Sequence, residues 1–268
     1  MTALAHSLSL PGPRLVRAEI LKLRKRRGLL AILAAATIGA SVVAYGTLAI
    51  LHAANPAHHG PAGGVLNLGH GLFVLALLGS VAAILAGATA GAGDLGAGVF
   101  RELAVTGRSR SALFRARIPG GLAFLLSFAA AAYALAALAT VVFAGYRTVP
   151  PPGLLAGSGA WLLLSCAFWF VLALGLASLV GSRSTVIGVL LAFQLAVTPI
   201  LASIPALGPG RELLPEVALT RLAPHAVRGL VGNGNVVPTS LGTAELVLAV
   251  WALALVALGE WRTVTRSA

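Results

Sequence analysis

Residues 91–96 read Gly-Ala-Gly-Asp-Leu-Gly, which is the spacing of the dinucleotide-binding motif G-x-G-x-x-G. That motif works only between a strand and a helix of a βαβ unit, whereas here it ends a long apolar run that is predicted to be a helix. Close helix packing or a flexible helix end explains these glycines better. A P-loop requires Gly-Lys followed by Ser or Thr, but Lys22 and Lys25 precede Leu23 and Arg26. The chain is therefore not expected to bind ATP by itself.

Other catalytic and metal-binding patterns are missing as well. No His is followed by Glu, so there is no H-E-x-x-H zinc helix, and no G-x-S-x-G nucleophile motif occurs. His52, His58 and His59 lie close together, but their spacing matches no standard metal site and carboxylates are missing nearby. The sequence predicts no catalytic residue, no metal site and no cofactor in this chain.

A few polar residues lie within the apolar runs and could contact a substrate. The main ones are His70 and Gln194, which could line a substrate path or form hydrogen bonds between helices. Ion-driven transporters place ionisable groups near the middle of the membrane. Asp94, Glu245 and Glu260 all fall near the ends of apolar runs, so ion-driven transport is disfavoured.

The composition indicates a membrane protein. Hydrophobic residues make up 58% of the chain and charged residues 10%, against about a quarter in soluble domains. No Asp, Glu, Lys or Arg occurs between Gly28 and Gly93. A helix needs about 20 apolar residues to cross the hydrocarbon core. Six stretches qualify, and they predict an all-α polytopic protein: residues 29–51, 65–90, 118–145, 159–180, 185–204 and 241–259.

The basic residues predict the orientation of these spans. With the N-terminus inside, fifteen of the 19 Lys and Arg residues lie in the cytoplasm and four lie outside. We therefore expect a protein of the inner or plasma membrane with both termini cytoplasmic. Because the positive charges flank apolar spans, the formal net charge of +12 is not taken as a sign of nucleic-acid binding.

Two further segments are predicted to be helical, and one span is predicted to be irregular. In residues 14–27, Val16, Ile20 and Leu23 form an apolar stripe, which favours an interfacial helix on an anionic leaflet or, alternatively, a disordered basic tail. Residues 208–240 are expected to form an external loop that is partly helical and dips back onto the membrane. Pro224 interrupts its one apolar helical face, which consists of Leu219, Leu222, Ala223, Ala226, Val227 and Leu230. Pro199 and Pro205 are expected to kink or end the fifth span. The basic residues assigned to the interface are Arg14, Arg17, Lys22, Arg24, Lys25, Arg26 and Arg27.

Residues 94–117 resemble the cytoplasmic segment of type-2 ATP-binding-cassette (ABC) transporter permeases. There, an acidic residue and a glycine precede a short helix, then a small-residue turn with Ser-Arg, then a helix that returns to the membrane. Ser109 and Arg110 match that turn, while Asp94 stands where the family often has Glu and Gly107 where it often has Pro. The layout of a basic amphipathic helix, six spans and a long loop before the sixth is also similar.

The resemblance implies a half-transporter. Two permease subunits, identical or different, would form the path, and a separate ATPase dimer carrying ATP and Mg²⁺ would dock beneath it. Residues 99–103 would be the coupling helix, with Phe100 as apolar anchor, Arg101 and Glu102 as polar contacts, and Val99 and Leu103 at its ends. The cargo would be a hydrophobic or amphipathic small molecule such as a drug or antibiotic, or a lipid or glycan. The alternatives are a non-transporting membrane anchor or sensor, and a basic loop that only determines topology.

Overall fold

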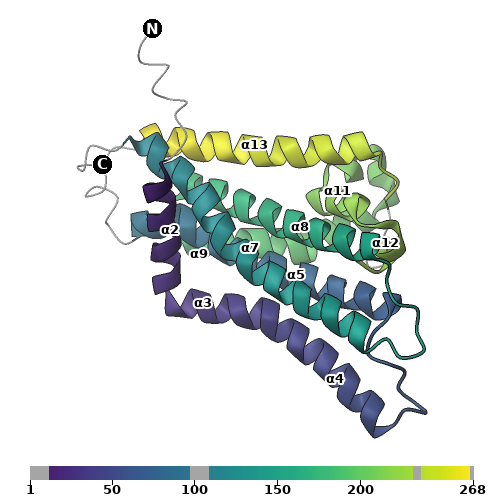
Figure 1. Cartoon of the computed structure of the whole chain (residues 1–268). Helices are drawn as coiled ribbons and strands as arrows, with labels where there is room; N and C mark the ends of the chain where they lie inside the picture. Colours follow the sequence, from purple (N-terminus) through teal and green to yellow (C-terminus); the bar gives the residue numbers. More distant parts are fainter. Residues whose placement is uncertain (1–11, 97–108, 232–236, 266–268) are drawn as a thin grey trace.

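The computed structural model describes residues 12–96, 109–231 and 237–265, and within these ranges it is helical with no strand. Six helices are long and apolar enough to cross a membrane, which confirms the predicted multi-pass all-α fold. Figure 1 shows them side by side in a bundle. Their bounds are Arg27–Ala54, Val65–Gly93, Arg110–Val142, Pro152–Val180, Arg183–Ser203 and Leu241–Thr265.

These spans consist of the following elements. The first contains α3 (Arg27–Ala34), the π-helical turn η2 (Ala35–Gly39) and α4 (Ala40–Ala54). The second, third, fourth and sixth are α5 (Val65–Gly96), α7 (Arg110–Val142), α8 (Pro152–Val180) and α13 (Leu241–Thr265). The fifth contains α9 (Arg183–Ala192), the π-helical turn η3 (Phe193–Val197) and α10 (Thr198–Ser203).

The bundle has two distinct ends (Figure 1). At the end that we call the basic end, α2 (Pro13–Lys25) lies across the helices and packs against the start of α7. At the opposite end, the loop end, lie the 3-10 helix η4 (Pro205–Leu213) and the short helices α11 (Pro215–Leu222) and α12 (His225–Val231).

The α2 helix packs on protein through its apolar stripe. Val16 and Ile20 are half-buried and Leu23 is buried. A Cβ atom built on Gly120 of α7 would lie 2.7 Å from Cβ of Glu19 and 3.1 Å from the carbonyl oxygen of Val16, so the two backbones touch there. The predicted helix is present, but its stripe faces α7 rather than lipid alone.

Glycines allow the central helices to approach closely. A Cβ atom on Gly87 would lie 2.3 Å from the carbonyl oxygen of Phe170, and one on Gly91 would lie 2.5 Å from that of Leu174. These two glycines are four residues apart on α5, the small-xxx-small spacing of membrane helix pairs. The predicted packing role of the glycines is thus confirmed at Gly91.

The fifth span is irregular near its two prolines, as expected. The π-helical turn η3 precedes Pro199, and the helix then continues to Ser203. Ile204 is extended, with ψ of 101°, as the residue before a proline prefers. Pro199 therefore changes the helical winding without ending the span, and Pro205 lies just beyond its end.

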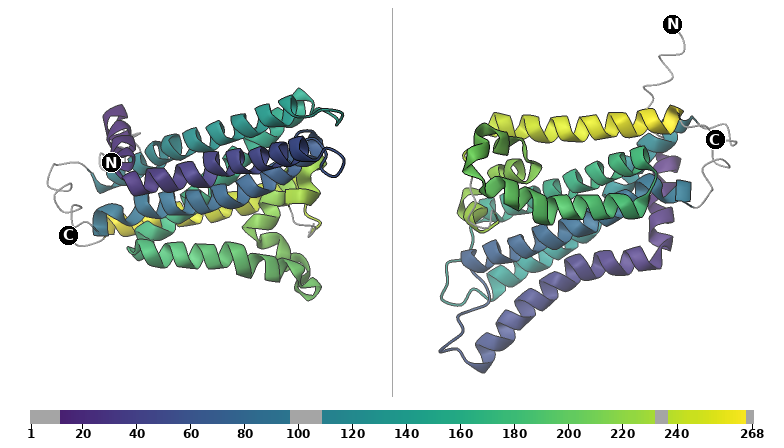
Figure 2. Two further views of the ribbon diagram at one scale, coloured as in Figure 1. Left: turned by 90° about the horizontal axis from the view of Figure 1, so that it is seen from below. Right: turned by 180° about the vertical axis from the view of Figure 1, so that it is seen from behind.

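Residues 205–231 form a helical layer against the bundle, as Figure 2 shows from two further sides. Leu219, Ala223 and Val227 are buried, as the predicted apolar face requires. Ala226 is exposed, so its place on that face was wrong. The extended backbone of Ala223, with ψ of 145°, breaks the helix before Pro224 and gives α12 a new direction.

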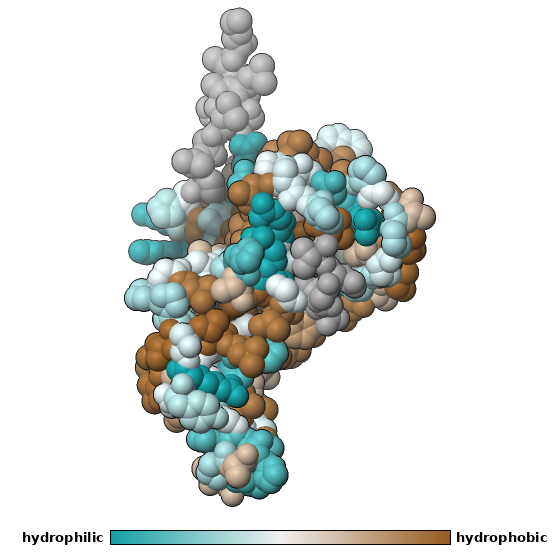
Figure 3. Space-filling model, turned by 90° about the vertical axis from the view of Figure 1, so that its right-hand side faces the viewer, coloured by the Kyte–Doolittle hydropathy of each residue, from teal (hydrophilic) through white to brown (hydrophobic). Residues whose placement is uncertain are grey.

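Apolar side chains cover the outside of the spans. On α13, for example, Leu246, Leu253 and Trp261 are all more than half exposed. In the view onto the loop end, hydrophilic residues gather at the tip where α4 ends, and hydrophobic residues are exposed beside it (Figure 3). Since water does not solvate such helix faces, this is the surface of a multi-pass membrane protein.

Candidate functional site

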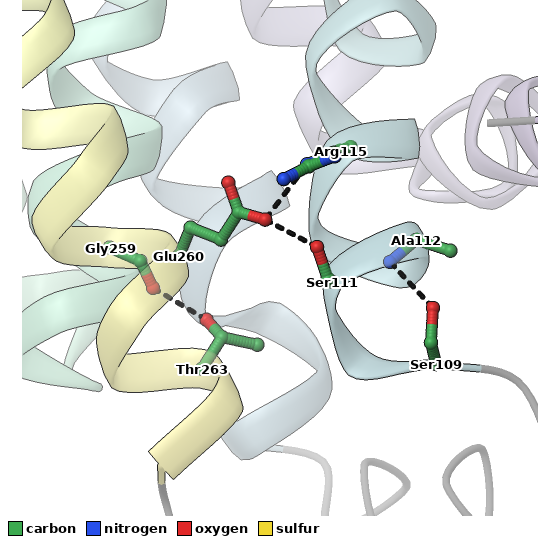
Figure 4. Close-up of polar contacts among 7 residues, drawn as sticks. All are labelled: Ser109, Ser111, Ala112, Arg115, Gly259, Glu260 and Thr263. Carbon is green, nitrogen blue, oxygen red and sulfur yellow. Dashed lines mark hydrogen bonds and ion pairs between the residues drawn. The ribbon is translucent and has the colours of Figure 1, made fainter. Parts of the chain in front are cut away.

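The sequence-predicted coupling residues fall largely outside the described chain. Val99, Phe100, Arg101, Glu102 and Leu103 lie between α5 and α7 in residues 97–108, which the structure does not describe. The backbone of Asp94 belongs to the last turn of α5. Ser109 caps α7, because its hydroxyl oxygen accepts a hydrogen bond from the backbone N–H of Ala112 at 3.2 Å (Figure 4). The predicted turn before the returning helix therefore ends in a helix cap.

The basic residues assigned to the membrane interface have different environments. Lys22 lies 2.6 Å from Glu19, and Arg26 is half-buried with its guanidinium against Gly93 of α5. A cation there opposes the negative end of the α5 helix dipole. The remaining five are exposed and free to face anionic headgroups: Arg14, Arg17, Arg24, Lys25 and Arg27.

Gln194 is buried inside the bundle. It lies in η3 with 6% of its surface exposed, and its Nε2 donates a hydrogen bond to Ser80 Oγ on α5. Its Oε1 atom is buried and accepts no hydrogen bond from the protein. This side chain therefore bridges two spans and still has an acceptor to offer a ligand.

A cavity of about 40 Å³ adjoins Gln194. It is lined by α5, α8, η3 and α11, and Ser165 and Gln194 lie near the middle of their spans. This volume accommodates a small polar group or water, but no drug-sized molecule. The lining residues are Phe73, Ala76, Leu77, Trp161, Ser165, Trp169, Gln194, Glu216 and Leu219.

Glu216 brings a carboxyl group into this cavity. Its Oε2 atom is buried and accepts no hydrogen bond, and burial raises the pKa of the carboxyl to about 7. The expectation that the acids fall near the ends of the apolar runs did not include this carboxyl. It was based on the spans alone, whereas the acid comes from the loop before the sixth span. A signal was present in the sequence, since Glu216 is followed directly by the apolar residues Val217, Ala218 and Leu219.

Two tryptophans hold α11 in place. The indole N–H of Trp161 on α8 donates to the carbonyl oxygen of Leu219 at 2.8 Å, and that of Trp251 on α13 donates to Leu213 at 3.1 Å. The chain is extended at Leu214, before Pro215, so Glu216 enters the first turn of α11. These contacts hold α11, and with it Glu216, against α8 and α13.

The loop end carries a second cavity, of about 290 Å³. The other face of α11 lines it with Val217, Thr220 and Arg221, and Arg228 of α12 adds a second guanidinium. Burial lowers the pKa of Arg228, and the positive charge of Arg221 lowers it further. One short helix thus lines both an inner cavity and a cavity at the loop end.

His70 does not join Gln194. It lies on α5 and is exposed, and it is absent from the lining of either cavity. Spacings of three and four residues place His70, Phe73 and Leu77 on one helix face. Of the two predicted substrate-path residues, only Gln194 lines a cavity.

Two polar contacts link the helices at the basic end. Arg117 is 1% exposed, and its guanidinium donates to the carbonyl oxygen of Gly91 at 3.1 Å. Glu260 of α13 accepts from Arg115 Nε at 2.8 Å and from the Ser111 hydroxyl, both on α7 (Figure 4). Arg117 is one of the fifteen basic residues assigned to the cytoplasmic side, and the structure places it between helices.

Comparison of the chain with models of known protein families and with curated proteins finds no match. Among the described residues, no cluster of three His, Cys, Asp or Glu side chains could hold a metal ion. What the site offers is binding chemistry: a carboxyl, an amide oxygen and aromatic faces inside a membrane bundle.

Proposed function

We propose that the chain is the permease subunit of an ATP-driven exporter of the type-2 ABC kind, which moves a hydrophobic or amphipathic small molecule across the cell membrane. One structural relationship carries the proposal. The continuous helix α5 lines the inner cavity with Phe73, Ala76 and Leu77 and runs to Gly96, directly before the segment that resembles a coupling helix.

The helix lengths support a connection to a partner outside the bilayer. The helices α5 and α7 contain 32 and 33 residues. At ~1.5 Å per residue each is roughly 50 Å long, against a hydrocarbon core of about 30 Å. Both therefore project from the bilayer, and the segment between them joins their ends at the basic end. A movement of that segment would be transmitted to the cavity by the continuous helix α5.

In this proposal two permease subunits form the path, and a separate ATPase dimer binds ATP and Mg²⁺. The basic face of α2 lies at an anionic leaflet, and both termini are cytoplasmic. The alternative is a membrane anchor or sensor without transport, for which the inner cavity would be a packing defect rather than a binding site.

The decisive experiment is reconstitution with an ABC ATPase that co-purifies with this chain. The purified chain alone should hydrolyse no ATP, and the complex in vesicles should transport only with ATP. Phe100→Ala should weaken ATPase association by ~30-fold, because an apolar anchor at an interface centre contributes ~2 kcal/mol or more. Arg101→Glu should act similarly by reversing a contact charge.

Phe143→Ala is the matched control, since Phe143 is exposed at the loop end. Wild-type ATPase binding by the Phe100→Ala, Arg101→Glu double variant would remove residues 99–103 as the coupling element. Transport driven by a proton gradient without ATP would contradict the exporter proposal, and a lack of transport in every condition would favour the anchor or sensor.

A further inference from the structure

The inner cavity combines acceptors with aromatic side chains in a way that selects a particular ligand. Gln194 Oε1 and Glu216 Oε2 are both buried, and neither accepts a hydrogen bond from the protein. A buried acceptor without a donor destabilises the protein unless a ligand or a water molecule satisfies it. Gln194 is 94% buried and held by its bond to Ser80, so it keeps its place against the cavity.

The remaining lining favours positive charge. Trp161, Trp169 and Phe73 present aromatic side chains to the same cavity, and the faces of such rings attract cations. The indole N–H of Trp161 is engaged by Leu219, which fixes the orientation of its ring. Apart from Glu216, no ionisable side chain lines the cavity in the part of the chain that the structure describes.

We propose that this cavity binds the ammonium group of an amphipathic amine, with the Glu216 carboxylate as counter-ion and the Gln194 amide oxygen as second acceptor. The inference rests on the proposed function, because it names the substrate class of that permease. An ammonium group supplies the N–H donors that both acceptors lack, and it fits a volume of about 40 Å³.

The apolar tail of such an amine has a direction in which to extend. Phe73 is half-buried and Leu77 is 36% exposed, so the cavity wall formed by α5 reaches the outside of the bundle. The tail would lie along these two side chains while the head group stays in the cavity. Binding of an anion is disfavoured, because the anion would be repelled by the Glu216 carboxylate and would find no donor in Gln194 Oε1.

The proposal is tested by calorimetry on the purified chain in zwitterionic nanodiscs, with octylammonium as probe and 1-octanol as its uncharged match. Octylammonium should bind the wild type, and Glu216→Gln should weaken that binding at least ~10-fold at pH 8, where the carboxyl is ionised. Gln194→Leu should weaken it several-fold. Glu245→Gln is the control, because Glu245 is an exposed acid on α13 and its loss changes the net charge equally.

A second measurement uses the unaltered protein and does not depend on the folding of variants. A hydrophobic carbodiimide should modify Glu216, as detected by peptide mass spectrometry, and octylammonium but not 1-octanol should protect it. Equal affinity of wild type and Glu216→Gln, or equal protection by the alcohol, would overturn the proposal. The ATPase is absent from both assays. A failure of the chain to couple to an ATPase would therefore contradict the exporter proposal without contradicting the amine site.

Discussion

The carboxylate of Glu260 on α13 lies 2.8 Å from Nε of Arg115 on α7, with the side chains 22% and 28% exposed (Figure 4). The two residues are 145 positions apart in the sequence. Their contact joins the sixth span to the start of the third, close to the segment that resembles a coupling helix. A force on that segment would therefore act on α13 as well as on α5 and α7.

Neutralising the ion pair between Arg115 and Glu260 should weaken the contact between α7 and α13 and lower the free energy of unfolding. Arg115→Gln, Glu260→Gln and the double variant form a cycle whose coupling free energy should be about 0.5–1.5 kcal/mol, since the pair is partly buried and hydrogen-bonded. Thermal unfolding in detergent measures it. Glu19 and Lys22, three residues apart on one helix, provide a control cycle with a smaller expected coupling. Simple additivity of the Arg115 and Glu260 changes would show that the contact contributes nothing.

The close approach of α5 and α8 should tolerate no side chain at Gly87. Gly87→Ala would place Cβ 2.3 Å from the carbonyl oxygen of Phe170, which forces the helices apart at a cost of ~1–3 kcal/mol or more. The matched control is Gly188→Ala on α9, because nothing lies within 4 Å of that Cβ position. Melting temperatures of the two variants in one detergent compare them. Equal melting temperatures would contradict the backbone contact.

Glu216 should make stability depend on pH. Its folded pKa of about 7 exceeds the ordinary value of 4.5, so between these pH values the folded state binds more protons than the unfolded state. The free energy of unfolding should then fall as pH rises from about 4.5 to above 7, by up to ~3 kcal/mol at ~1.4 kcal/mol per pKa unit.

Glu216→Gln keeps the shape and cannot ionise, so it should remove this fall. The quantity to measure is the difference in melting temperature between wild type and variant, at pH 5 and at pH 8. The effects of all other acids on the melting temperature are the same in both proteins and cancel in this difference. The melting temperature of the variant should rise relative to that of the wild type as the pH increases from 5 to 8. A difference that does not change with pH would place the carboxyl in water.

Cysteine labelling tests the orientation. In a Cys166→Ala background, a cysteine at Ala57 should react with an impermeant reagent in intact cells, and one at Thr265 only after lysis. Both positions are exposed and lie at opposite ends of the bundle, so access depends on the side of the membrane. The prediction follows from the excess of basic residues at the basic end. Labelling of position 265 in intact cells would reverse the topology.

The six spans were predictable because their cause is local. Hydrocarbon offers no hydrogen-bond partner to the backbone, so an uncharged apolar run of about 20 residues must become a helix wherever it crosses. The same holds for the end of the fourth span, where Gly181 adopts a φ of 81° and Ser182 caps the following helix. Both residues lie between the predicted spans 159–180 and 185–204.

The interior chemistry depended on contacts between distant residues. Residues 208–240 read as an external loop, but α11 packs into the core through Ala218 and Leu219 and is hydrogen-bonded by Trp161 and Trp251, which brings Glu216 to the inner cavity. Likewise, the sequence predicted only that Arg117 helps to orient the spans. In the structure its guanidinium lies between helices and donates a hydrogen bond to the carbonyl oxygen of Gly91. Hydropathy and charge, summed along the chain, thus predicted which segments cross the membrane. Which polar groups face one another inside was decided by helix packing, because burial and hydrogen bonding are properties of the assembled neighbours and not of the residue.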